Sequence, residues 1–269
     1  MLGAIYGDVI GSYYEVRCTK DYDFPFQHDS TFTDDMVLTV AVCKAILNNP
    51  ESITLFDLRQ RGLEYAGQYR QYYSYYPSAG FGNMFSSWAR EHAFRVNRSY
   101  ANGGAMRAVP IGYAYETIEQ VLLQAKASCY YTHNNREAVK AAGAVAAAVF
   151  MARKGESKEA IRRYIEGKFR YDLSRSIAEI REGYVFNSRA SYSVPPAIIA
   201  FLESSDYESA VRNAVSLGGD ADTEACIAGG IAEAYYKEIP KEISDFCNRR
   251  IDYSLRKVAT EFCERYCKK

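Results

Sequence analysis

Residues 137–151 read EAVKAAGAVAAAVFM, a run dominated by alanine and valine. Its uncharged part extends from Ala141 to Ala152, between Lys140 and Arg153. A helix that is apolar on all sides belongs in a protein core, and side chains this small let neighbouring helices pack closely. A membrane-spanning helix needs roughly 20 apolar residues, so this run is too short to cross a bilayer. The stretch therefore predicts a buried helix.

Helical spacing recurs along the rest of the chain. Within residues 35–47, apolar side chains stand at positions 36, 37, 40, 41, 45 and 46, which lie on one helix face. Similar patterns occur at 206–217, 223–236 and 243–262, and no alternating strand of six or more residues is evident. With no repeat and no linker-like boundary, the sequence predicts an all-α, single-domain, multi-helix orthogonal bundle over residues 1–269.

A few irregular segments interrupt these helices. They are predicted at residues 16–33, 74–82, 100–104, 185–196 and 216–222. In a helical protein such segments either connect helices or build a functional site. Residues that carry chemistry are therefore expected in or beside these segments.

Composition narrows the class of protein. Of the 269 residues, 48% are hydrophobic and 25% are charged, which is typical of a folded globular protein. Lys plus Arg and Asp plus Glu both number 33, so no broad basic surface for nucleic acid or an anionic membrane is expected. The seven cysteines form no CxxC pair, and the first residues lack a basic segment typical of a signal peptide. These features favour a reduced, cytoplasmic protein, and they leave the oligomeric state open.

Two acidic clusters precede predicted helices. Thr33-Asp34-Asp35 stands before the helix at 36–47, and Asp220-Ala221-Asp222-Thr223 stands before the helix at 224–236. Thr and Asp are common N-caps, and acids in a first turn interact favourably with the helix dipole. One cap needs only one acceptor, however, so capping alone does not account for two aspartates and a threonine at both places.

The alternative interpretation is a binuclear metal cleft. Carboxylate and hydroxyl oxygens suit hard divalent cations such as Mg²⁺ or Mn²⁺. Four carboxylates suit two ions about 3.5–4 Å apart better than one ion. Zinc is disfavoured, because the chain has only three histidines and no cysteine pair.

Other residues have ordinary structural explanations when taken alone. Asp8 lies in GAIYGDVIG, where small residues at 3, 7 and 11 let another helix approach, and we interpret it as a buried hydrogen-bonding acid. Glu15, at the end of this helix, would usually be a solvated residue. The segment SYANGGAMR at 99–107 is typical of a glycine-rich anion-binding turn at a helix start, although such turns are also plain connectors. A lone His133 is more often a structural residue than a catalyst.

Five segments together resemble the ADP-ribosylglycohydrolase family, which includes the dinitrogenase-reductase-activating glycohydrolase and ADP-ribosylhydrolases. They are GAIYGDVIGSYYE, FTDDMVLTVAV, YANGGAMRAVPIG, YTHNNREAV and SLGGDADTEACIAGGIAEAYY, and they occur in the family's order from residue 3 to residue 236. The resemblance implies an all-α fold with two Mg²⁺ or Mn²⁺ ions in a cleft. The implied metal ligands are Thr33, Asp34, Asp35, Asp220, Asp222 and Thr223.

The resemblance also implies roles for other residues. Glu15 matches the catalytic glutamate, and His133 matches a histidine near the substrate. Residues 191–196 (SYSVPP) resemble the segment near the adenine. The loop that holds the diphosphate and distal ribose corresponds to Ser99, Tyr100, Asn102, Gly103 and Gly104.

Two residues depart from the family pattern. Ala101 stands where glycine is common, and it would be strained if the position requires a positive φ. Glu224 stands where an apolar residue is commoner, and it adds negative charge near the implied metals.

The expected activity is metal-dependent hydrolysis of the glycosidic bond between ADP-ribose and a protein side chain or other conjugate. Cleavage would pass through an oxocarbenium-like state, with Glu15 or an aspartate moving the protons. Two other classes remain open. One is a catalytically silent ADP-ribose binder or structural family member, which the intact Glu15 and ligand set argue against. The other is a two-metal phosphate-ester hydrolase, which would release phosphate instead of ADP-ribose.

Overall fold

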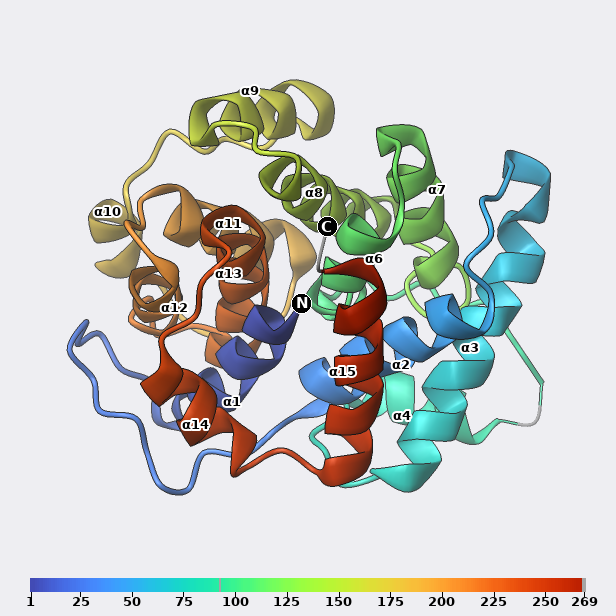
Figure 1. Ribbon diagram of the computed structural model, residues 1–269, viewed down its shortest axis with the longest axis horizontal. Coiled ribbons are helices and arrows are strands. Elements are labelled where there is room, and N and C mark those ends of the chain that lie inside the picture. The colour runs from blue at the N-terminus through green and yellow to red at the C-terminus, as the bar shows by residue number, and fades with distance from the viewer. Residues whose placement is uncertain (92, 268–269) are drawn as a thin grey trace.

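The computed structural model describes residues 1–91 and 93–267, and within them the chain is helical with no β-sheet (Figure 1). Two isolated antiparallel bridges, Arg98 with His133 and Ala101 with Arg189, are the extended pairings of the described part. The helices are α1 (Leu2–Arg17), α2 (Asp34–Asn48), the 3₁₀ turn η1 (Leu55–Asp57), α3 (Leu58–Tyr75), α4 (Asn83–Arg90), α5 (Gly103–Met106), α6 (Val109–Ala114), α7 (Ile118–Cys129), α8 (Arg136–Arg153), α9 (Lys158–Phe169), α10 (Ile177–Arg181), α11 (Ala190–Leu202), α12 (Tyr207–Val215), α13 (Ala221–Tyr236), α14 (Lys241–Asn248) and α15 (Tyr253–Tyr266). The predicted all-α fold is confirmed.

Helices α1 and α13 form the most closely packed pair in the molecule. Their contact depends on the small residues at 3, 7 and 11, as the sequence predicted. A Cβ atom on Gly7 would lie 2.1 Å from the carbonyl oxygen of Ala225, and one on Gly11 would lie 2.3 Å from that of Ala221. Only glycine permits two helix backbones to approach so closely, so these residues fix the separation of the two helices.

Helices α13 and α8 contact each other, and both are rich in buried alanine. Helix α13 also packs against α11 and α12, and α8 packs against α6 and α7. In Figure 1, α1, α11, α12 and α13 lie left of centre, α8 and α9 lie above, and α3 and α7 lie to the right. The predicted buried helix at 137–151 is therefore confirmed as α8.

The prediction of one helix over 243–262 is wrong. The chain forms α14 and α15 there, separated at residues 249–252. Asp252 caps the second helix, because its carboxylate accepts hydrogen bonds from the amides of Ser254 and Leu255. This cap starts a new helix at Tyr253 and so interrupts the single helix that the apolar spacing alone predicts.

The predicted loop at 185–196 is also wrong in its second half. Helix α11 begins at Ala190 and contains Pro195 and Pro196 in its interior. The side chains of Val194, Pro196 and the following apolar residues are buried against the core. Tertiary burial therefore outweighs the loss of backbone hydrogen bonds at the two prolines.

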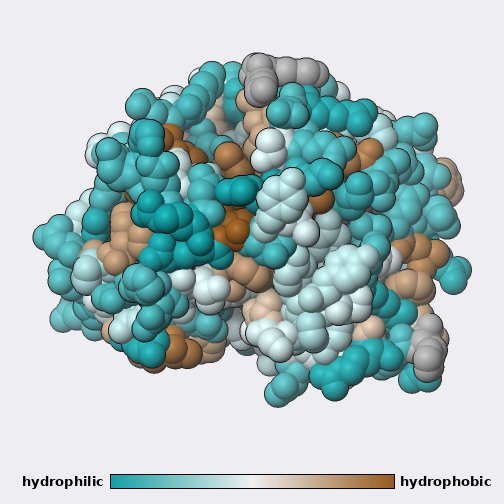
Figure 2. All heavy atoms as spheres, turned by 60° about the horizontal axis from the view of Figure 1, so that its bottom comes forward, coloured by the Kyte–Doolittle hydropathy of each residue, from teal (hydrophilic) through white to brown (hydrophobic). Residues whose placement is uncertain are grey.

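The outer surface is mixed in character. Figure 2 shows hydrophilic residues over most of the face in view, with separate smaller hydrophobic patches between them. No helix among residues 1–91 and 93–267 has the length and apolar character needed to cross a bilayer.

Candidate metal centre and ligand cavity

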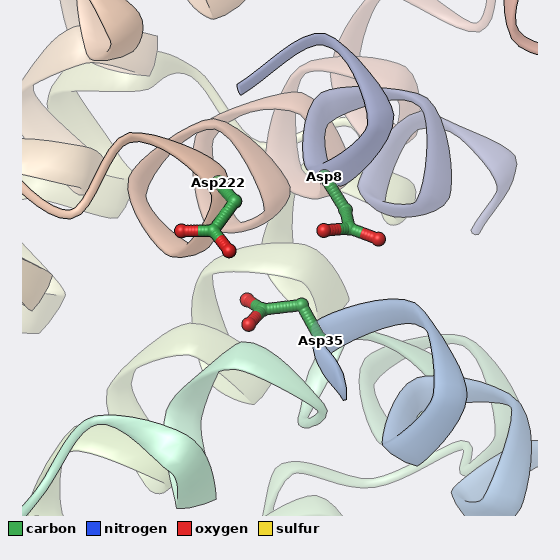
Figure 3. A group of neighbouring side chains, drawn as sticks. All are labelled: Asp8, Asp35 and Asp222. Atoms are coloured by element: carbon green, nitrogen blue, oxygen red, sulfur yellow. The ribbon is translucent and has the colours of Figure 1, made fainter. Parts of the chain in front are cut away.

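Three helices that are far apart in sequence bring three aspartates together. Asp8 comes from α1, Asp35 from the first turn of α2, and Asp222 from the first turn of α13 (Figure 3). One carboxylate oxygen of each lies within 4.8 Å of those of the other two. All three side chains are buried, and in Figure 3 they point toward one another.

A second group of acids shares one member with the first. Glu15, Asp220 and Asp222 also have carboxylate oxygens within 4.8 Å of one another. Asp222 therefore belongs to both groups, which is the arrangement expected of a carboxylate that bridges two cation positions. The two sequence clusters, from α2 and α13, are brought together by the fold.

Hydrogen bonds hold these acids in place. The Thr33 hydroxyl donates to Asp8 Oδ1 at 2.6 Å, and the Thr33 amide donates to Asp8 Oδ2 at 3.0 Å. The Thr223 hydroxyl donates to Asp35 Oδ2 at 3.2 Å. Asp8 is thus the hydrogen-bonding acid that the sequence indicated, but it also belongs to the acidic group, which the sequence analysis missed. A usable signal was its spacing, since positions 8 and 15 are seven residues apart and share one helix face.

The carboxyl groups favour their protonated form when no cation is present. Burial, followed by the proximity of Asp222, raises the pKa of Glu15 to about 7 and that of Asp34 to about 8. The same two causes raise the pKa values of Asp8, Asp35 and Asp220 well above their ordinary range. Mutual repulsion between buried acids is the expected consequence of placing them this close.

The donor set fits a hard divalent cation. The two groups contain only carboxylates, with no His or Cys among them. Asp35 Oδ1 is buried and has no hydrogen-bond partner among the described residues, although a buried carboxylate oxygen normally has one. A cation of the Mg²⁺ or Mn²⁺ class would satisfy this oxygen and relieve the repulsion.

All of these acids except Asp8 line a cavity of about 370 Å³. Of the residues implied as site residues, those that line the cavity are Glu15, Asp34, Asp35, Asp220, Asp222, Thr223, Ser99, Tyr100, Asn102, Gly103 and His133. Thr33 and Gly104 are not part of the lining. Asp34 lines the cavity without belonging to either acidic group, and Arg107 lines it although the sequence analysis did not select it.

The glycine-rich segment is held between two other parts of the chain. The Asn102 amide donates to the carbonyl of Ser188 at 2.8 Å, and the Asn102 side chain donates to Asp220 Oδ2 at 2.8 Å. Asn102 therefore links this loop to the acidic end of the cavity. The helix that follows, α5, has only four residues, so the loop does not open a long helix. Ala101 is not among the described residues with positive φ. The backbone strain that a positive φ would impose on alanine is therefore absent at this position.

Residues 191–196 do not line this cavity, although Ser193 Oγ accepts a hydrogen bond at 3.1 Å from the side chain of Asn102, which does. Ser191, Tyr192, Pro195 and Pro196 line a second cavity of about 410 Å³. No residue lines both cavities. The implied position of this segment near an adenine stays a prediction.

Glu224 is completely buried outside the ligand cavity. Its Oε1 accepts a hydrogen bond from the Tyr184 hydroxyl at 2.5 Å. Burial raises the pKa of the Glu224 carboxyl well above its ordinary value. Burial therefore favours the neutral acid, in contrast to the negative charge that was expected at this position. Gly219 packs against the same pair, because a Cβ there would lie 2.3 Å from Cε1 of Tyr184.

The all-helical fold and the acid-lined cavity together define an all-α protein with a site suited to divalent cations, and comparison with known proteins identifies the family. Residues 1–268 match the family model described as ADP-ribosylglycohydrolase. The chain belongs to this family, and it is a glycohydrolase.

Several relatives are similar over most of their length. The ADP-ribosylhydrolase ARH3 of Homo sapiens is 26% identical over 92% of this chain and 87% of its own length. The protein of the same name from Gallus gallus is 27% identical over 88% of this chain and 78% of its own length. A solved structure titled "ADP-ribosylglycohydrolase-related protein complex" is 26% identical, covers 97% of this chain and 94% of its own, and superposes with a TM-score of 0.66.

Proposed function

We propose that this chain hydrolyses the glycosidic bond linking ADP-ribose to a protein side chain or other conjugate and releases ADP-ribose. We further propose that two Mg²⁺ or Mn²⁺ ions bind at the two acidic groups. One observation carries the proposal: Asp222 belongs to both groups, inside a cavity whose other wall is the segment from Ser99 to Gly103. The similarity to ADP-ribosylhydrolase ARH3 proteins supports the choice of substrate class.

The proposed metal ligands are those that the resemblance implies, with Asp8 added as a neighbouring acid. They are Thr33, Asp34, Asp35, Asp220, Asp222 and Thr223. When bound, the cations would supply Lewis acidity to the vicinal hydroxyls of the proximal ribose and to water. The remaining chemistry is assigned to residues of the chain.

Glu15 is proposed as the residue that moves the proton. Its carboxyl lines the cavity and is half-buried, with a pKa raised to about 7 by burial and by Asp222. A group with this pKa can both accept and release a proton near neutral pH. Because Glu15 also lies within 4.8 Å of Asp220 and Asp222, it can additionally contact a cation.

The diphosphate is assigned to the segment of Ser99, Tyr100, Asn102, Gly103 and Gly104, with His133 beside it. The amides of Gly103 and Gly104 donate to no acceptor among the described residues, and Gly103 lines the cavity, so its amide can bind a ligand oxygen. Asn102 fixes the distance between this segment and Asp220 through its side-chain hydrogen bond. The ligand would therefore be bound at both ends, which orients the anomeric carbon beside Glu15.

The test is to offer arginine-, serine- and nucleobase-linked ADP-ribose to the purified chain with Mg²⁺ or Mn²⁺. Chromatography would follow free ADP-ribose and inorganic phosphate separately. We expect free ADP-ribose from at least one conjugate and none with Asp222→Asn. Release of phosphate alone would favour the phosphate-ester alternative, and tight binding without turnover of any conjugate would favour the silent binder.

We also propose a cytoplasmic location. All seven cysteines are free thiols in the structure, and four of them are buried in the core. Such use of cysteine is typical of reducing compartments.

A further inference from the structure

Arg107 is a buried cation without an acidic partner. It follows α5, its side chain is fully buried, and its guanidinium lies 4.1 Å from the centre of the Tyr69 ring. None of the ion pairs formed by residues 1–91 and 93–267 includes it. Its Nε and Nη1 atoms have no hydrogen-bond partner within the same part of the chain. Its charge lies near enough to act on Asp34 without forming an ion pair with it. Burial of a cation that has no ion-pair partner is costly, so this arginine calls for a functional explanation.

The guanidinium and a threonine together contact one nitrogen of His133. Arg107 Nη2 donates to Thr132 Oγ1 at 2.5 Å and lies 3.5 Å from His133 Nδ1. Thr132 Oγ1 in turn lies 3.0 Å from His133 Nδ1. A guanidinium has donors only, and the Thr132 hydroxyl, which already accepts from Arg107, has its proton free to donate. Arg107 Nη2 also donates to the carbonyl of Ser128 at 3.3 Å, so its two protons are directed mainly to Ser128 and Thr132. The nearby positive charge favours a lone pair on Nδ1, to which the Thr132 hydroxyl can donate, and this arrangement favours the ring proton on Nε2.

The other ring nitrogen faces the ligand cavity. A Cβ on Gly103 would lie 3.0 Å from His133 Nε2, and both residues line the cavity. Nε2 has no hydrogen-bond partner in the described chain, and neither do the amides of Gly103 and Gly104. An Nε2–H group would thus add a second donor beside the free amide of Gly103, which lines the cavity.

We propose that Arg107 and Thr132 are positioning residues that hold His133 as the neutral Nε2–H tautomer. In this form His133 donates one hydrogen bond to an anionic ligand oxygen, and the charge of Arg107 compensates the anion from behind the ring. The inference rests on the proposed function in one respect, because it takes the anion to be the diphosphate of ADP-ribose. His133 is then a fixed donor and not a proton-transfer group.

The electrostatics of the site agree with a neutral ring. Burial, and then the charge of Arg107, lower the pKa of His133 well below its ordinary value. A second proton would have to occupy Nδ1, where it would face the guanidinium and the donated proton of Thr132. The geometry alone disfavours that arrangement.

The first experiment reads the tautomer directly in the ligand-free protein. Long-range ¹H–¹⁵N spectra of histidine-labelled protein at pH 7.5 distinguish a proton on Nε2 from one on Nδ1, and His133→Gln identifies the signals of His133 among the three histidines. We expect the Nε2–H pattern in the native chain and in Thr132→Ser. Thr132→Val removes the hydroxyl at nearly constant volume and should give a mixture of tautomers. An Nδ1–H pattern in the native chain, or no change in Thr132→Val, overturns the proposal.

The second experiment measures ADP-ribose binding by calorimetry on the same variants. Thr132→Val should weaken binding about tenfold, and Thr132→Ser should restore it. If the tautomer changes in Thr132→Val while the affinity does not, the donor role of His133 is refuted. If the native chain does not bind ADP-ribose, the proposed function fails, and the spectra still decide the tautomer. Melting curves establish that each variant is folded.

Discussion

The hydroxyl of Thr223 donates to Oδ2 of Asp35 at 3.2 Å, and this contact joins two acidic segments that lie 188 residues apart in the chain. Each segment begins a helix, and either one could be understood as an ordinary N-terminal cap. Once α1, α2 and α13 are packed together, the same residues become a dense group of carboxylates. Acids that are far apart in the sequence therefore interact directly in the folded chain.

Divalent cations should stabilise the folded chain. A cation that binds only the native acids shifts the folding equilibrium by mass action, so the melting temperature should rise as Mg²⁺ or Mn²⁺ is added. Asp35→Asn and Asp222→Asn should each reduce this rise and lower activity strongly. Because the acids act as a unit, the double variant should be scarcely worse than either single variant.

The matched control for the cation experiment is Asp29→Asn, since the Asp29 side chain is 80% exposed. This variant should show the same rise in melting temperature on addition of Mg²⁺ or Mn²⁺ as the native chain. The outcome that contradicts the proposal is a pair of fully additive activity losses together with an undiminished rise in melting temperature in both Asp35→Asn and Asp222→Asn. It would show that the two segments are separate capped helices.

Glu15→Gln should abolish turnover and leave the helical fold intact. Glutamine keeps the size of the side chain but cannot take up a proton, and the residue is only half-buried, so the core is undisturbed. Circular dichroism and steady-state hydrolysis would measure the two effects. More than about a tenth of native activity would mean that under ~1.4 kcal/mol of barrier depends on this carboxyl, which is incompatible with its proposed role.

The metal-free chain should become less stable as the pH rises from about 5 to about 8. Carboxyls of the unfolded chain titrate near pH 4, whereas the pKa of Glu15 is raised to about 7 and that of Asp34 to about 8. Between these limits the native state holds more protons than the unfolded state, so the free energy of unfolding falls by up to ~1.4 kcal/mol per pH unit for each group. Urea unfolding in the presence of a chelator would measure the slope.

Two controls accompany the pH series. Asp34→Asn removes one titrating group and should flatten the slope. A saturating divalent cation should restore stability at pH 8, because deprotonated acids are then its ligands. A metal-free chain that gains stability over this pH range would contradict the arrangement of acids.

Gly7→Ala should destabilise the protein severely. The added Cβ would lie 2.1 Å from the carbonyl oxygen of Ala225, so α1 and α13 would have to move apart. We expect a loss of about 3 kcal/mol or more, since overpacking between backbones cannot be relieved by a rotamer change. The control is Gly67→Ala in α3, where a Cβ meets nothing within 4 Å and alanine should stabilise the helix by up to ~1 kcal/mol. Equal stability of the two variants would refute the close packing of α1 and α13.

Local information in the sequence determined most of the helices and the family. Apolar spacing found α2, α8, α12 and α13, because helix periodicity is set by neighbours three and four residues apart. It failed at the break between α14 and α15, where the Asp252 cap prevails, and in α11, where burial overrides two prolines. The Thr-Asp-Asp and Asp-Ala-Asp-Thr segments and the glycine-rich loop also contain many, though not all, of the residues that line the cavity.

Only the tertiary structure decided how those residues act on one another. The place of Asp8 in the acidic group, the sharing of Asp222 and the contact of Arg107 and Thr132 with His133 all join separate segments. The pKa values of the acids likewise depend on burial and on charges from other helices, which no local pattern encodes. Contacts of this kind follow from how α1, α2 and α13 pack, and glycines at 3, 7 and 11 set the separation of α1 and α13. The sequence by itself predicted most of the residues proposed to carry the chemistry, because they stand in local motifs, whereas the packing of the helices decided their distances and their pKa values.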